Sequence, residues 1–157
     1  MSAPIITILN DSEVTVASWD AGTVQADHDS SVLTLRVWNN KGGSTAVSDL
    51  KDVSITTLDT DGGTSTDVVV GKWVRVNVPA LDGSSTSWTS IGGATVKNVR
   101  ADGLTSAAGY VIRGTTNDGT LTGATPNYAT IRLKVHVPLN ATPGTKVWKT
   151  RLNGYYV

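Results

Sequence analysis

The chain has 157 residues, of which 39% are hydrophobic and 17% charged, and its 13 Lys and Arg residues balance its 13 Asp and Glu residues. This length fits one domain with a single core, and a net charge of zero gives no field to attract nucleic acid or an anionic membrane surface. Cysteine is absent, which excludes a disulfide framework and a thiolate metal site.

Residue usage favours strands over helices. The sequence contains 23 Thr, 20 Val, 16 Gly and 14 Ser residues, and Glu13 is the only Glu among the 13 acids. β-branched residues fit strands, whereas Gly, Ser and Asp fit turns. We therefore expect one all-β domain over residues 1–157, with no membrane partner and no nucleic-acid partner.

Short apolar runs at residues 5–9 and 14–19 predict the first strands, and residues 33–38 predict the first long one. The beginning of the chain, MSAPIITILNDSE, has neither the basic residues nor the apolar run of a signal peptide. In LTLRVWNN the alternation places Leu33, Leu35 and Val37 in the core and points Arg36 and Trp38 outward.

After a strand at residues 53–58, the turn DTDGGTSTD presents Asp59, Asp61 and Asp67. Carboxylates near a glycine resemble the start of a Ca²⁺-binding loop, which makes these three a candidate Ca²⁺ site. Gly63 stands where a third oxygen ligand is needed and no Glu closes the loop, so a tight turn explains the same residues. We expect no metal and no cofactor.

The second long strand, GKWVRVNVP, repeats the alternation: Val74, Val76 and Val78 point inward, and Trp73 and Arg75 point outward. The stretch 81–128, rich in Gly, Ser and Thr, is the least regular. Within it, residues 88–91, 96–100 and 109–113 predict short strands, and we expect a hairpin insertion or an arm outside the main sandwich.

The third long strand lies in YATIRLKVHVP, and residues 146–152 predict the last one. The alternation points four residues inward: Ile131, Leu133, Val135 and Val137. About 8–10 strands with short turns predict an antiparallel β-sandwich. Because no segment shows the helical period over three turns, we expect at most one short helical turn.

Two stretches, LTLRVWNNKGGSTAVSDLKDVSITT and ATIRLKVHVPLNATPGTKVWKTRL, resemble bacterial immunoglobulin-like modules of the CARDB and related kinds. The pattern that includes TTLDTDGG, KWVRVNVPAL and NYATIRLKVHVP also looks like small structural proteins of tailed bacteriophages. The resemblance implies an immunoglobulin-like sandwich that decorates the head or forms part of the tail. It also implies a location in the virion, after synthesis in the host cytoplasm and release by lysis.

Trp38, Trp73, Arg36 and Arg75 are the candidate interface residues, because Trp and Arg are enriched where proteins meet. Two other interpretations stay open: loops cover the tryptophans, or the rings stack on sugars. Serines lack a Gly-x-Ser-x-Gly context, so we expect no enzyme. We expect a non-catalytic virion protein that binds other virion proteins and copies of itself; the alternative is an adhesion module that binds host-envelope glycans.

Overall fold

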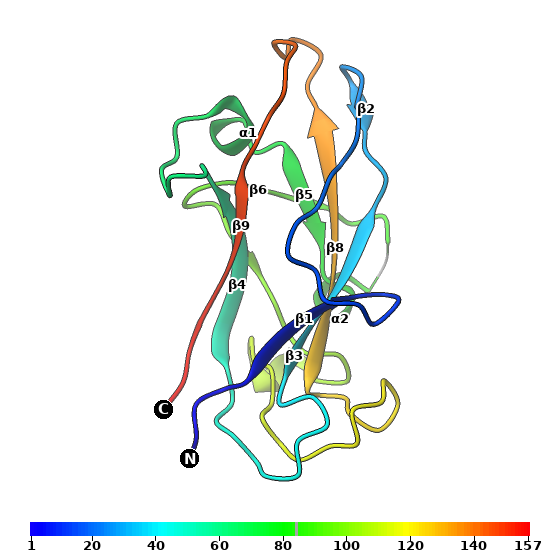
Figure 1. The fold of residues 1–157 in the computed structure, drawn as a ribbon, viewed down its shortest axis with the longest axis vertical. Helices are drawn as coiled ribbons and strands as arrows, with labels where there is room; N and C mark the ends of the chain where they lie inside the picture. The colour runs from blue at the N-terminus through cyan, green and yellow to red at the C-terminus, as the bar shows by residue number, and fades with distance from the viewer. Residues whose placement is uncertain (84) are drawn as a thin grey trace.

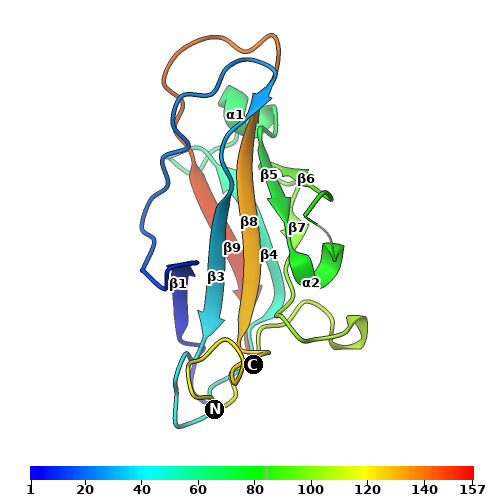
Figure 2. The same cartoon turned by 90° about the vertical axis from the view of Figure 1, so that its right-hand side faces the viewer.

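The computed structural model describes residues 1–83 and 85–157. Its strands form two antiparallel sheets that lie face to face, as Figures 1 and 2 show. The chain is therefore an all-β sandwich, as its composition and alternating pattern predict. Both ends of the chain lie at the same end of the sandwich (Figure 1).

The larger sheet contains most of the long strands. Its order is β1 (Ile6–Asn10), β3 (Leu33–Asn39), β8 (Tyr128–Val137), β5 (Val74–Asn77) and β6 (Thr89–Ile91), and the short β2 (His28–Asp29) pairs with the end of β8. The smaller sheet has the order β7 (Lys97–Asn98), β4 (Lys51–Leu58) and β9 (Lys149–Tyr155). β9 is thus an edge strand of the smaller sheet.

The core lies between the two sheets and contains the residues that the alternation points inward. In β5 and just after it, Val74, Val76 and Val78 have no exposed surface, and in β8 Ile131 and Leu133 are at most 1% exposed. Strands with a period of two place such residues on one face. The predicted core of the long strands is confirmed.

Three short helical turns are present in the described residues, where at most one was predicted: α1 (Asp67–Val70), α2 (Pro79–Asp82) and the 3₁₀ turn η1 (Ser106–Ala108). Proline at the first position of α2 has the φ that a helix needs and lacks an N–H that would be unpaired there. The Asp82 carboxylate accepts the Val78 N–H at 2.7 Å. Single turns of this kind are too short to show a helical period in the sequence.

The prediction of an insertion outside the sandwich is wrong. Residues 81–128 supply β6 to the larger sheet and β7 to the smaller one, so this stretch crosses between the layers. At the corner, Gly92 and Thr95 form a bridge, and a Cβ on Gly92 would lie 2.2 Å from the Val69 carbonyl oxygen. The irregular sequence therefore reflects a tight corner that only glycine fits.

Two predicted strands, residues 14–19 and 109–113, form only single bridges, Leu9 with Thr15 and Leu50 with Ile112. The first of these segments continues as extended coil up to β2. It crosses the front of the sandwich in Figure 1, as the dark-blue trace that rises from β1. This coil forms one wall of the candidate site.

Candidate binding groove

A groove runs along the open side of the sandwich between two extended segments. We call residues 16–27, which lead from β1 to β2, the N-terminal lip, and residues 141–152, which lead into and through part of β9, the C-terminal lip. The groove consists of two adjoining hollows of about 790 and 490 Å³. Both hollows are lined by both lips, and they share Trp19, Lys146, Val147 and Trp148.

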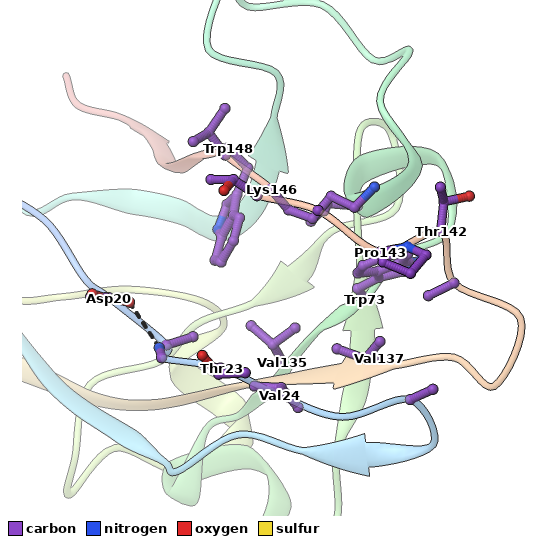
Figure 3. A pocket seen from close by; sticks show the side chains of 18 of the residues that line it. Asp20, Thr23, Val24, Trp73, Val135, Val137, Thr142, Pro143, Lys146 and Trp148 are labelled. Carbon is purple, nitrogen blue, oxygen red and sulfur yellow. Dashed lines mark hydrogen bonds between the residues drawn. The ribbon is translucent and has the colours of Figure 1, made fainter.

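The floor of the groove is the inner surface of the larger sheet. In the upper hollow it contains Trp73, Val135 and Val137, which Figure 3 shows between the labelled residues of the two lips. In the lower hollow the floor is equally apolar: Leu33, Leu35, Val37, Ile131 and Leu133. Trp73, Ile131 and Leu133 are at most 6% exposed, so the lips cover most of this apolar floor.

Two tryptophans, one from each lip, meet where the hollows adjoin. The Trp19 and Trp148 rings contact each other edge to face, with centroids 5.9 Å apart and planes at 88°. This is a favourable aromatic geometry. Both rings are half-buried and pack on the core, and Figure 3 shows Trp148 pointing from its lip into the cavity. The pair holds the lips together at one level of the groove.

The backbone of both lips is largely unpaired. Among the described residues, neither segment 17–24 nor segment 142–148 makes a backbone–backbone hydrogen bond. The Asp20 carboxylate accepts the Gly22 N–H at 2.8 Å, and Gly22 has a φ of +72°, so a local turn bends the N-terminal lip. Unpaired extended backbone beside an edge strand can accept another strand.

Lys146 anchors the C-terminal lip to α1. Its ammonium donates to the Asp67 carboxylate at 2.6 Å and lies 5.7 Å from the centre of the Trp73 ring. The cation therefore contacts both a carboxylate and an aromatic face. The contact to Trp73 places Lys146 above the floor of the upper hollow.

The prediction that Trp38 faces solvent is wrong, because the loop before β8 covers it. The ring is fully buried in a second small core with Leu9, Ala124 and Tyr128 on the outer face of the larger sheet. Its centroid lies 4.7 Å from that of Tyr128, and burial raises the pKa of Tyr128. Of the interpretations that the sequence leaves open, the one in which a loop covers the ring applies to Trp38.

Trp73 is also buried rather than outward, with 6% of its surface exposed. It precedes β5, and the positive φ of +52° at Lys72 turns the chain so that both Trp73 and Val74 face inward.

The two predicted interface arginines, Arg36 and Arg75, are half-buried. Arg36 lies 3.5 Å from Glu13. The structure does not bring the four predicted interface residues together as one exposed patch.

The turn at residues 59–67 uses its carboxylates internally. Asp59 is buried and accepts hydrogen bonds from Ser65 and Thr66, and these lower its pKa to about 2, the Thr66 hydroxyl most strongly. Asp61 accepts the Gly63 N–H, and Asp67 pairs with Lys146. Over residues 1–83 and 85–157, no group of three or more acidic or His side chains is close enough to hold a metal ion. The candidate Ca²⁺ site is thus not assembled, and these residues close a turn.

The groove residues were not singled out from the sequence. Trp19 and Trp148 lie in segments predicted as strands, and the pattern KVWKTRL alternates Trp148 and Leu152 with Lys149 and Arg151. That alternation signals one apolar and one basic face. The alternation does not predict which apolar face lines a groove, because this depends on the order of the strands in the sheets.

No protein-family model, no curated protein and no solved structure matches this chain. Within the described residues, no helix is long and apolar enough to cross a membrane.

Proposed function

We propose that this chain is a non-catalytic structural protein of a bacteriophage virion, a head decoration or tail component, which acts through protein–protein contacts. The observation that supports contact-based action is the apolar groove between two extended segments, in which residues 17–24 and 142–148 make no backbone–backbone hydrogen bond within the described chain. The phage context comes from the sequence resemblance, which also implies an immunoglobulin-like sandwich.

The groove suits a protein partner for two reasons. Its floor is apolar and Val147 at its rim is 59% exposed, and burial of apolar area is the main driving force of association. Its walls are the N-terminal lip, the C-terminal lip and the edge strand β9, whose free N–H and C=O groups can pair with an incoming strand. Backbone pairing would give affinity, and the apolar floor would select the side chains.

Co-sedimentation tests the proposal. A lysate of cells that produce this chain together with its phage is centrifuged, and the pelleted particles are analysed by quantitative mass spectrometry. We expect the chain in the pellet in a fixed ratio to the major capsid or tail protein, and also after the particles are banded in a density gradient. A chain that stays wholly in the supernatant would contradict the proposal.

A second candidate function is glycan binding, which three tryptophans in the upper hollow favour. Trp19, Trp73 and Trp148 line it together with the hydroxyl groups of Thr23, Thr142 and Thr145. Aromatic faces and polar groups in one concave site are typical of small-ligand recognition. Isothermal titration with purified host cell-wall polysaccharide tests this candidate: heat that disappears in Trp148→Ala supports it, and no heat with the wild-type protein contradicts it.

A further inference from the structure

Charge is divided sharply between the two ends of the sequence. Residues 1–35 contain five acids and no Lys or Arg: Asp11, Glu13, Asp20, Asp27 and Asp29. Residues 119–157 contain five cations and no Asp or Glu: Arg132, Lys134, Lys146, Lys149 and Arg151. The N-terminal lip comes from the first stretch and the C-terminal lip from the second, so the groove has an acidic wall and a basic wall.

Several of these lip charges have no ionic partner within the chain. Asp20 and Asp27 on the acidic side, and Lys149 and Arg151 on the basic side, take part in none of the salt bridges of the described residues. In particular, Asp20 and Lys149 both line the groove but do not pair with each other across it. They remain available to a partner of complementary charge.

Asp20 and Lys149 flank the same aromatic contact, Asp20 lining the upper hollow and Lys149 the lower one. Each directly follows one of the two tryptophans that contact each other across it, Trp19 and Trp148. The chain rises through the N-terminal lip and descends through the C-terminal lip, as Figure 1 shows. The two walls are therefore antiparallel in direction and opposite in charge, and they meet at the contact between Trp19 and Trp148.

We propose that two copies of this chain bind each other groove to groove, about a two-fold axis parallel to the groove. A rotation of 180° about such an axis leaves the position of each residue along the groove unchanged. It moves each residue from one side of the groove to the other. It places the acidic lip of one copy against the basic lip of the other, with Asp20 near the partner's Lys149, and the contact occurs twice. An axis across the groove would instead set acidic wall against acidic wall, which like charges oppose. This inference rests on the proposed function, because it names the partner in a protein–protein contact.

The same arrangement would also pair free backbone groups of the lips and cover an exposed apolar side chain. The acidic lip of one copy would run antiparallel to the basic lip of the other, the direction that antiparallel pairing needs. Val147, which lines both hollows and is 59% exposed, would be covered by the partner. An apolar side chain at the centre of a charged contact is typical of an interface.

Charge reversal in separate proteins tests the inference. Asp20→Lys and Lys149→Glu are purified separately and studied alone and mixed by sedimentation equilibrium at low and high salt. The wild-type protein should dimerise, more weakly at high salt. Each variant alone should dimerise about tenfold more weakly or worse, because two like-charge contacts replace two attractive ones. The equimolar mixture should form heterodimers with nearly wild-type affinity.

The mixture separates a contact from a folding defect. Asp20 also closes the turn at Gly22, so Asp20→Asn, which keeps a side-chain acceptor, is measured beside Asp20→Lys and should weaken the dimer less. Thr122→Lys, which adds a charge at the opposite end of the sandwich, should leave it unchanged. A monomeric wild-type protein at millimolar concentration, or variants whose mixture does not recover, would overturn the inference. If the protein is monomeric but still pellets with phage particles, the proposed function stands and only the dimer is excluded.

Discussion

At the scale of single residues, Trp38 has a buried ring whose polar atom is unused. The Trp38 Nε1–H has no hydrogen-bond partner among the described residues, although the whole side chain is buried. We expect Trp38→Ala to lower the free energy of unfolding by about 3–5 kcal/mol, because it leaves a large cavity. Trp38→Phe should cost only about 1–2 kcal/mol, since no hydrogen bond is lost. Urea denaturation measures both, and equal losses would contradict this account.

Asp59 makes folding stability depend on pH. Its pKa in the folded protein is about 2, below its ordinary value of 3.8, because Thr66 and Ser65 donate to the carboxylate. The stabilisation is complete above pH 3.8 and is lost as the pH falls through about 2. We expect Asp59→Asn to unfold at lower urea concentration than the wild type at pH 6, and the difference to shrink toward pH 2. Asp61→Asn is the matched control, and a difference independent of pH would contradict the assignment.

At the scale of elements, strand order predicts which backbone exchanges hydrogen fastest. β8 is paired on both sides, by β3 and β5, whereas segment 142–148 has no backbone partner within the described chain. We expect hydrogen–deuterium exchange within seconds in 142–148 and the slowest exchange in β8. In a concentrated wild-type sample, exchange in 142–148 should slow relative to Asp20→Lys, because only the dimer protects it. Equal rates in the two proteins would show that this lip is not in the interface.

The alternation of the sequence is sufficient to predict the core strands, since a period of two assigns each residue to one face. It misplaces Trp38 because the loop that covers this ring, near Ala124, lies far along the chain and has no period of its own. Trp73 is misplaced by a backbone turn at Lys72 that alternation does not register. The groove depends on the order of strands from distant parts of the chain, which local pattern does not specify.

At the scale of the whole molecule, the direction of the symmetry axis decides which residues of two copies meet. A two-fold axis parallel to the groove would bring residue 20 of one copy near residue 149 of the other, and would keep the two copies of residue 20 on opposite sides. An axis across the groove would bring like residues together. Because the chain contains no cysteine, single cysteines introduced at these positions report on this geometry without background.

We expect a mixture of Asp20→Cys and Lys149→Cys proteins to form disulfide-linked heterodimers under mild oxidation, visible on a non-reducing gel. Each protein alone should stay uncrosslinked, because a disulfide needs Cα atoms within about 7 Å. Thr122→Cys, mixed with either, is the control for random collision at the far end of the sandwich. Rapid crosslinking of Asp20→Cys with itself would place the axis across the groove. The acidic walls would then face each other, and the charge pattern of the lips would have to serve a different partner.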